Sequence, residues 1–329
     1  MTMREDVRVS LLDGVVERST LADNDGKSGA RLERAVLGDG STVIVKHMTP
    51  ADDFTMSMVG DTESREYRLW AAGVLDRLPA ELGHCVLEGF VADGETVLVM
   101  RDLGDAVLTW HDRLDGSQVR ASIGAVAALH LAFLGAPPVE APAVHDELAA
   151  FAPTRMQALL DGANPLPGLT LRGWEHFRSL VPHDLAEAVI ALAEDPAMLA
   201  ARLAEGPVTL VHGDVATVNM APLDGRLYML DWALASAAPG ALDLARFLAG
   251  CAHVVDVSPD ELIQIYRAAA GEAYDERSMR LALLSGVVWL GWNKALDIVE
   301  HPDPAVRARE TAGLTWWLAR AEEALEKDL

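Results

Sequence analysis

Residues 207–232 constrain this chain more than any other stretch. They begin with a short apolar run rich in β-branched residues, at positions 208–211, which is typical of a buried strand. Two further short runs flank Asp224-Gly225, a dipeptide favoured in two-residue hairpin turns. The sequence therefore predicts a buried strand, a polar loop and a β-hairpin in succession.

The predicted turn also determines which hairpin residues face each other. With Asp224-Gly225 as the turn, Asn219 faces Leu230 and lies next to Asp231. An amide oxygen and a carboxylate then meet at one end of the hairpin, near the loop that contains Asp214. Such ligands suit Mg²⁺, which takes one or two protein oxygens and completes its shell with phosphates and water. Asp214 is placed to act as a base on a hydroxyl.

The same residues resemble a known family. The pattern His212-x-Asp214-x4-Asn219, followed by a hairpin and Asp231-Trp232, is similar to the catalytic segment of the aminoglycoside phosphotransferase and choline kinase family, a branch of the protein-kinase-like fold. The resemblance implies that Asp214 is the catalytic aspartate, that Asn219 and Asp231 hold the metal, and that His212 braces the loop. The alternative is a half-buried hairpin with unrelated polar residues.

The composition is that of an ordinary folded protein. The chain has 329 residues, of which 50% are hydrophobic and 23% charged, enough for one large domain or two lobes. Its two cysteines, Cys85 and Cys251, are too few for a disulfide framework and favour a reducing compartment. The first ten residues lack the apolar core of a signal peptide, and the longest apolar run, 281–292, is too short to span a bilayer. We expect a cytoplasmic protein without a membrane partner.

The net charge is strongly negative. At −23, the chain has little basic surface with which to bind nucleic acid. An acidic cleft would concentrate cationic small molecules, although acidic surfaces also serve solubility alone. Charge by itself therefore selects no substrate.

The N-terminal region is predicted to be a small β-rich lobe. Runs at 7–16, 30–37 and 41–46 are typical of strands, with a glycine-rich turn at 38–40. The loop 23–29 contains Gly-Lys-Ser but lacks the first glycine of a P-loop, and no helical pattern follows it. It could close over nucleotide phosphates as the first hairpin loop of kinase-like folds does, although it lacks their glycine signature.

Lys46 and Glu66 form the second part of the resemblance. Lys46 is one of only four lysines and ends an apolar strand that resembles the Val-Ala-Ile-Lys strand of kinases, where the ammonium pairs with nucleotide phosphates. A helix is predicted over about 62–78, with Glu66 on its apolar stripe. A carboxylate there needs a cation, and Lys46 is the candidate. Glu63 is the second choice, and either glutamate could instead face solvent. Lys46 could likewise be a lysine that snorkels from a strand end.

The lobe boundary is predicted after the next two strands, at 85–90 and 96–100. They lead into Arg101-Asp102-Leu103, which the resemblance identifies as the hinge whose backbone binds the nucleotide base. The predicted lobes are therefore 1–102, which binds nucleotide, and 103–329, which contains the catalytic segment and the acceptor site.

The rest of the chain is predicted to be mostly helical. The helical stretches lie at 117–134, 145–160, 173–180, 184–205 with an interruption at Pro196, 259–270, 276–299 and 304–325. His130 is expected to be a satisfied core or interface histidine. Trp289, Asn293 and Asp297 share one helix face and could line a site for an amine or sugar, although tryptophan-rich helices more often pack a core.

These features predict a two-lobed α+β protein-kinase-like fold. The resemblance implies ATP or GTP as co-substrate, Mg²⁺ as cofactor, and transfer of the γ-phosphoryl group to a hydroxyl of an aminoglycoside-like antibiotic or related metabolite. The alternatives are a metabolite kinase for an amino alcohol or sugar, a nucleotide-binding pseudoenzyme, and a metal-dependent hydrolase that uses His212, Asp214 and Asp231. In the hydrolase His212 would point at a metal, and in the kinase it would point into the loop backbone.

Overall fold

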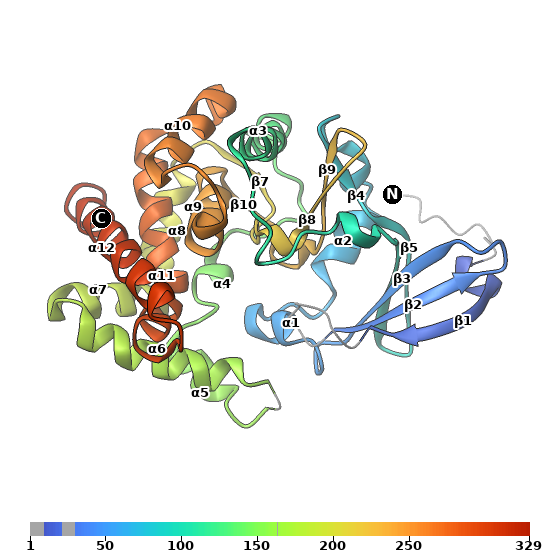
Figure 1. Cartoon of the computed structure of the whole chain (residues 1–329), viewed down its shortest axis with the longest axis horizontal. Coiled ribbons are helices and arrows are strands. Elements are labelled where there is room, and N and C mark those ends of the chain that lie inside the picture. The colour runs from blue at the N-terminus through green and yellow to red at the C-terminus, as the bar shows by residue number, and fades with distance from the viewer. Residues whose placement is uncertain (1–9, 22–29, 163) are drawn as a thin grey trace.

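The structure has a small β-rich part and a larger helical part, as Figure 1 shows. It is a computed structural model that describes residues 10–21, 30–162 and 164–329. Short strands and the helix α3 lie between the two parts. The predicted α+β fold with a small antiparallel sheet is confirmed.

The N-terminal sheet is antiparallel throughout, in the order β1-β2-β3-β6-β5. Its strands are β1 (Val15–Thr20), β2 (Arg31–Leu37), β3 (Thr42–Met48), β5 (Val86–Ala92) and β6 (Glu95–Arg101). The predicted first strand at 7–16 is wrong over residues 10–14, where η1 (Leu11–Gly14) forms instead. The Ser10 and Asp13 side chains cap this turn reciprocally, which competes locally with strand pairing. Residues 7–9 and the loop 23–29 lie outside the described residues.

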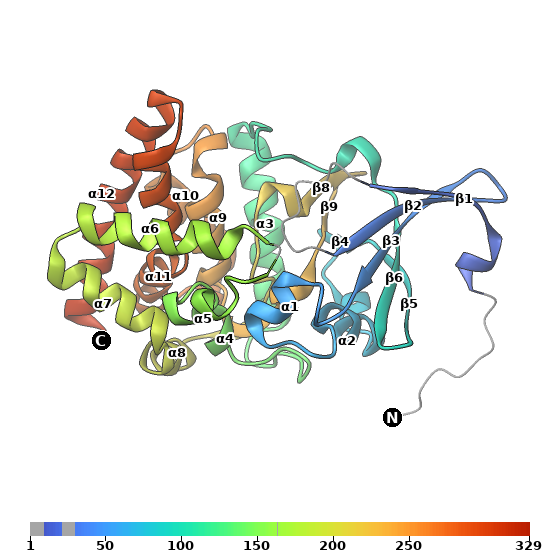
Figure 2. The ribbon, with the colours of Figure 1, turned by 90° about the horizontal axis from the view of Figure 1, so that it is seen from below.

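The helices beside this sheet are shorter than predicted. The expected helix at 62–78 is wrong in length: the structure has α2 (Arg65–Ala71) and a separate turn η2 (Leu75–Arg77). Gly73 adopts a left-handed φ of 70°, which ends the helix, and Ser64 caps its start. A further helix, α1 (Phe54–Val59), was not predicted. Figure 2 shows α1 and α2 together at the edge of the sheet that faces the helical part.

Three short strand pairs lie between the two parts. β7 (Val208–Val211) pairs with β10 (Ser236–Pro239), and β8 (Met220–Leu223) forms a hairpin with β9 (Arg226–Met229). The predicted hairpin register is confirmed, because Met220 faces Met229 and the Leu230 N–H donates to the Asn219 carbonyl over 2.9 Å. Asp224 and Gly225 both have positive φ, as a two-residue type I′ turn requires. β9 also pairs in parallel with β4 (Leu82–His84) from the N-terminal part.

The larger part consists mainly of helices. They are α3 (Gly116–Ala132), α4 (His145–Leu148), α5 (Pro153–Ala158), α6 (Leu166–Leu180), α7 (His183–Glu194), α8 (Ala197–Ala204), α9 (Ala241–Cys251), α10 (Pro259–Ala270), α11 (Glu276–Glu300) and α12 (Pro304–Lys327). The predicted helix at 145–160 is divided because Pro153 begins a new helix. Five 3₁₀ turns complete this part: η3 (Gly104–Ala106), η4 (Thr217–Asn219), η5 (Trp232–Leu234), η6 (Ala252–Val254) and η7 (Gly271–Ala273).

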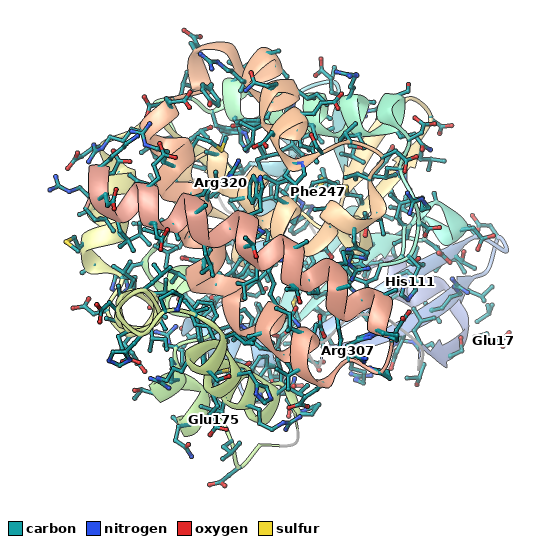
Figure 3. The ribbon with its side chains drawn as sticks, turned by 60° about the vertical axis from the view of Figure 1, so that its left-hand side comes forward. Glu17, His111, Glu175, Phe247, Arg307 and Arg320 are labelled. Carbon is teal, nitrogen blue, oxygen red and sulfur yellow. The ribbon has the colours of Figure 1, made fainter. Side chains whose placement is uncertain are left out.

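The helix α11 forms the centre of this part. It packs against α6, α9 and α12, and Figure 3 shows α12 on the outside, with Arg307 and Arg320 along it and Phe247 of α9 behind. Among the described residues α11 is the one helix long and apolar enough to cross a membrane, with a mean hydropathy of 1.2. Because 61% of the apolar 18-residue segment of α11 is buried inside the protein, α11 is packed as a core helix.

A buried ion pair joins the two parts. Arg65 of α2 contacts Glu147 of α4, and it also donates to the Ala235 carbonyl over 2.9 Å. Arg65 is 4% exposed and Glu147 is 6% exposed. The sheet ends at Arg101, and we keep the division between residues 102 and 103 as a proposed lobe boundary.

Candidate active site

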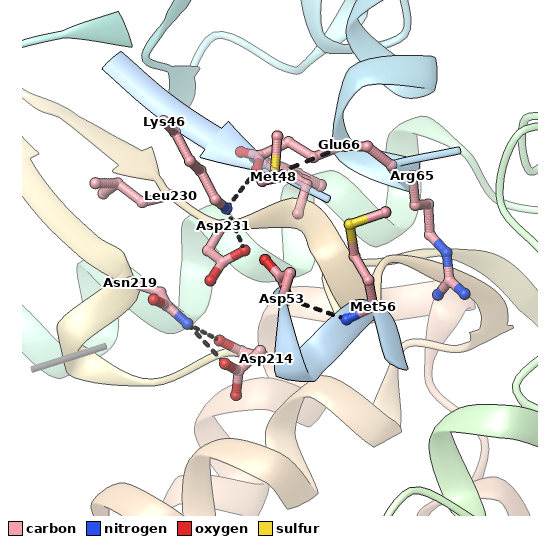
Figure 4. A network of polar contacts seen from close by, with 12 residues as sticks. Lys46, Met48, Asp53, Met56, Arg65, Glu66, Asp214, Asn219, Leu230 and Asp231 are labelled. Atoms are coloured by element: carbon pink, nitrogen blue, oxygen red, sulfur yellow. Dashed lines mark hydrogen bonds and ion pairs between the residues drawn. The ribbon is translucent and has the colours of Figure 1, made fainter. Parts of the chain in front are cut away.

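The Lys46 side chain lies between carboxylates from both parts of the chain. Its Nζ is 2.8 Å from Glu66 Oε2 and 3.0 Å from Asp231 Oδ1. The predicted pairing with Glu66 is confirmed as an ion pair. The Glu63 side chain is instead 72% exposed and lies 3.8 Å from Arg68. Figure 4 shows this network, with Lys46 and Glu66 facing Asp231, Asp214 and Asn219.

Asp53 adds a further carboxylate that sequence analysis missed. It caps α1 by accepting from the Met56 N–H over 3.0 Å, is 2% exposed, and lies near Lys46 and Asp231 in Figure 4. Burial raises its pKa, which Lys46 only partly counteracts. The sequence itself indicates only a local role for Asp53, because aspartate is a preferred helix N-cap residue. Its approach to Lys46 depends on tertiary structure.

The charges of this cluster determine the protonation of its members. Burial by itself would lower the pKa of Lys46, but Asp231, Glu66 and Asp53 raise it above its ordinary value of 10.5. Burial would raise the pKa of Asp231, but Lys46 holds it below its usual range. Lys46 and Asp231 are therefore held in their charged forms, and the carboxyl groups of the cluster outnumber its one lysine. A divalent cation would offset that excess negative charge.

Asp231 is held in an uncommon backbone conformation. Its φ is 60°, in the left-handed region, and it directly precedes the turn η5. A non-glycine residue there is strained, and such strain persists where the surrounding structure enforces it. In this conformation the Asp231 carboxylate contacts Lys46.

Asp214 is held by its neighbours on both carboxylate oxygens. The Asn219 Nδ2 donates to the Asp214 Oδ2 over 2.9 Å and to its carbonyl oxygen over 2.9 Å. Arg246 Nε donates to Oδ1 over 2.8 Å. The Asn219 amide thus directs its NH₂ group at Asp214 and its Oδ1 away from it. The predicted Asp214 and Asn219 are together, whereas Arg246 was not predicted.

His212 points into the loop backbone. Its Nε2 donates to the Leu230 carbonyl over 2.9 Å, and its Nδ1 accepts from the Asp214 N–H over 3.2 Å. Its ring also packs against Trp232, with the centroids 4.6 Å apart. Both ring nitrogens are therefore occupied by the backbone, which is the arrangement expected of a bracing residue.

Asp243 fixes the backbone of the same loop. It is fully buried and accepts from the His212 N–H and the Gly213 N–H, each over 2.8 Å. The His130 Nε2–H donates to Asp243 Oδ2 over 3.1 Å, and Nδ1 bonds the Tyr266 hydroxyl over 2.9 Å, so His130 is the satisfied core histidine that was expected. Only glycine fits at 213, because φ is 82° and a Cβ would lie 2.0 Å from the Leu234 carbonyl oxygen.

The proposed hinge residues directly follow the sheet. Arg101 contacts the Tyr228 hydroxyl at 3.3 Å, Asp102 pairs with Arg34 at 2.8 Å, and Leu103 is buried. Their binding of a nucleotide base stays a prediction.

The helix α11 brings only one of its three candidate residues close to the loop at 212–219, which is the proposed catalytic loop. Trp289 lies under the Arg246 guanidinium, 5.0 Å from it, while Asn293 bonds Asp297 at 3.5 Å further along the helix. Burial raises the pKa of Asp297. Trp289 lines a cavity of about 40 Å³ together with Gly213, and neither Asn293 nor Asp297 is part of it.

The cavity next to the catalytic loop contains unpartnered polar atoms. Within the described part of the chain, four of its buried atoms make no hydrogen bond: Glu147 Oε2, Ser236 Oγ, Arg246 Nη1 and Trp289 Nε1. Buried polar atoms normally have partners, so these four are available to bind a water or a ligand group. The volume suits a few water-sized groups, or the end of a larger molecule.

The two-lobed fold and the lysine, asparagine and aspartates at its centre are those of the protein-kinase-like class. Residues 74–281, more than half of the chain, match the model of the phosphotransferase enzyme family, so the chain belongs to that family. A search of curated proteins gave no significant match.

Solved structures show the same fold at low sequence identity. Choline kinase LicA from Streptococcus pneumoniae is 14% identical, with a TM-score of 0.53 over 94% of this chain and 95% of that chain. A spectinomycin phosphotransferase in complex with ADP and spectinomycin is 12% identical, with a TM-score of 0.52 over 94% and 89%. An aminoglycoside phosphotransferase from Streptomyces rimosus is 18% identical, with a TM-score of 0.51 over 85% and 96%.

Proposed function

We propose that the protein is a small-molecule kinase that transfers the γ-phosphoryl group of ATP or GTP to a hydroxyl of an aminoglycoside-like antibiotic or a related metabolite. The observation that supports this best is the arrangement of Lys46 between Glu66 and Asp231, with Asp214 and Asn219 beside it. Phosphoryl transfer needs positioning and charge neutralisation more than covalent chemistry, and these residue types supply both.

The residues present fit a Mg²⁺ ion. Asn219 Oδ1 and the Asp231 carboxylate would hold it, and the surplus of carboxylates over lysine gives it a favourable field. When bound, the ion would neutralise charge on the nucleotide phosphates.

The other residues have separate tasks. Lys46 binds phosphate oxygens, and Glu66 holds Lys46 in place. The backbone of Arg101-Asp102-Leu103 receives the base. Asp214 orients the acceptor hydroxyl and takes its proton.

The cavity near Trp289 supports an acceptor with a cationic or polar end. The free Glu147 Oε2 suits an ammonium group, and the Trp289 Nε1–H suits an oxygen. The net charge of −23 would favour a cation as well. The relatives named above act on choline, spectinomycin and an aminoglycoside, which are hydroxylated small molecules. An amino alcohol or sugar is the second choice of acceptor. The two free, buried cysteines fit a cytoplasmic location.

The alternatives have less support. A hydrolase using His212 as a metal ligand would need a free ring nitrogen, and both are bonded to the backbone. Within the described ranges, no three His, Cys, Asp or Glu side chains converge as a metal site. The complete set of Lys46, Asp214, Asn219 and Asp231 argues against a pseudoenzyme.

The test is a screen of hydroxylated antibiotics and metabolites for release of nucleoside diphosphate, combined with two variants. We expect Asp214→Asn to lower kcat about 10²–10⁴-fold and to change nucleotide affinity little, because this carboxylate contacts the hydroxyl and not the phosphates. We expect Asp231→Ala to abolish the Mg²⁺-dependent rise in melting temperature caused by nucleotide. Full turnover by Asp214→Asn would contradict the mechanism, and loss of metal binding in that variant would favour the hydrolase.

A further inference from the structure

The helix α9 contacts the catalytic loop at two points. Asp243 binds the backbone N–H groups of His212 and Gly213, and Arg246, three residues later on the same helix face, binds the Asp214 side chain. The first contact fixes the loop, and the second fixes the carboxylate that the loop presents.

The Arg246 guanidinium is itself held on several sides. Its side chain is 12% exposed, and its face lies over Trp289 with 5.0 Å to the ring centroid. The guanidinium also lies close to Gly250, one turn further along α9, because a Cβ at that position would be only 2.4 Å from Nη1. The guanidinium therefore has little freedom to turn away from Asp214.

The hydrogen bonds and the ion-pair contact at the Asp214 carboxylate leave one lone-pair site open. A carboxylate has about four lone-pair sites. The Arg246 Nε donates to Oδ1 over 2.8 Å and the Nη2 lies 2.8 Å from the same oxygen, while Asn219 Nδ2 occupies one site on Oδ2. Counting the contacts from the described residues, the fourth site is on Oδ2, on the oxygen next to the proposed metal ligand Asn219. The side chain is 26% exposed, so a ligand can reach it.

We propose that Arg246 is a positioning residue that blocks Oδ1 of Asp214, so that the acceptor hydroxyl binds at Oδ2 beside Asn219. This inference rests on the proposed function and adds the place where the hydroxyl binds. In the transfer step the hydroxyl oxygen forms a bond to the γ-phosphorus, and the bond from that phosphorus to the bridging oxygen breaks. The hydroxyl proton goes to Asp214 Oδ2, and nucleoside diphosphate leaves. Arg246 contacts none of the reacting atoms and keeps its charge.

The test measures nucleotide hydrolysis with water in place of the acceptor, so that no acceptor has to be known. The variants are Arg246→Ala, Arg246→Lys and Gly250→Ala, and the readouts are kcat for ADP release from MgATP and MgATP affinity by calorimetry. We expect Arg246→Ala to lower kcat about 10- to 100-fold with unchanged nucleotide affinity, because a misdirected base costs turnover and not phosphate binding. Added methylguanidinium should restore part of that loss by filling the space between Asp214 and Trp289.

The other two variants separate position from charge. Arg246→Lys keeps the charge but loses the second nitrogen, so we expect a smaller loss of kcat. Gly250→Ala keeps Arg246 intact and pushes its Nη1, so kcat should fall without any change at the catalytic loop itself. Arg280→Ala is the matched control, because Arg280 forms a similar two-nitrogen pair with Asp328 at 2.8 and 3.0 Å, away from the site. It should leave kcat unchanged.

Three results would overturn the inference. They are an unchanged kcat in Arg246→Ala, a loss of nucleotide affinity in parallel with kcat, and a failure of methylguanidinium to restore any activity when the variant is folded. The failure of the proposed function looks different. In that case the unaltered protein neither binds MgATP nor releases ADP, or Asp214→Asn is fully active, and the inference about Arg246 fails with it.

Discussion

Lys46 keeps its proton in the interior because carboxylates from both parts of the chain surround it. Its pKa is raised in the folded state above the ordinary 10.5. Its contribution to stability is therefore complete below about pH 10.5 and declines as the pH rises further, by about 1.4 kcal/mol per pH unit. The ion pairs of Lys46 thus stabilise the fold at neutral pH and weaken only in alkaline solution.

The substitution Lys46→Met tests this linkage. We expect a lower melting temperature at neutral pH, because Glu66 is 1% exposed and would be left without its cation, a change that typically costs about 3–5 kcal/mol. The difference in stability from the unaltered protein should begin to narrow above about pH 10.5, where the unaltered protein starts to lose this contribution. The double variant Lys46→Met/Glu66→Gln is the control and should be less destabilised. A difference in stability between the two proteins that stays constant with pH would contradict the raised pKa of Lys46.

The residues predicted from the sequence are those that local patterns place. Asn219 and Asp231 could be paired because a two-residue turn fixes the hairpin register, and Glu66 could be paired with Lys46 because it lies on an apolar helix face. Arg246 and Asp53 could not be predicted, because each reaches the site through the packing of a separate helix. No local pattern around Arg246 shows that its side chain contacts Asp214.

The helix α2 connects the two halves of the site. Glu66 on this helix holds Lys46, and the adjacent Arg65 holds Glu147 and the Ala235 carbonyl in the helical part. Burial raises the pKa of Glu147, although Arg65 counteracts this. A movement of α2 away from the helical part would therefore have to break a buried ion pair.

We expect Arg65→Ala to destabilise the protein by about 3–5 kcal/mol and also to weaken nucleotide binding, because Glu147 loses its partner and Glu66 loses its fixed position. Arg178→Ala is the matched control, since Arg178 and Glu187 form an exposed pair on α6 and α7 that should contribute little. Thermal melting and MgATP calorimetry distinguish the two effects. Normal nucleotide affinity in folded Arg65→Ala would show that α2 stays in place without this contact.

At the level of elements, the last three helices were predicted best. The helix expected at 173–180 is wrong in its start, because α6 begins at Leu166 with Pro167 in its first turn, and α9 was not predicted. The helix α10 has the predicted bounds, and α11 and α12 begin where predicted and end within two residues, because proline or an aspartate cap marks their starts. The length of α2 was overestimated because an isolated glycine inside a helical pattern can be tolerated and does not by itself mark the end of a helix. Gly73 ends α2 by adopting a positive φ, which periodicity does not reveal.

The whole molecule combines an acidic charge of −23 with a site rich in carboxylates. For a cationic acceptor identified by the screen, we expect kcat/KM to fall about tenfold as salt rises to about 1 M, because salt screens long-range attraction. For a neutral acceptor, or for hydrolysis by water, kcat/KM should change much less with salt. Salt-independent kcat/KM for a cationic acceptor would exclude electrostatic steering by the net charge.

The parallel pairing of β4 with β9 has a consequence for synthesis of the chain. Leu82 pairs with Leu227, which follows it by roughly 145 residues. At translation rates of about 5–20 residues per second, β9 leaves the ribosome on the order of 10 s after β4. Throughout that interval the backbone of β4 has no partner strand, and an exposed strand edge is a template for association with other chains. The short length of β4, three residues, limits that exposure while the catalytic hairpin is still being made.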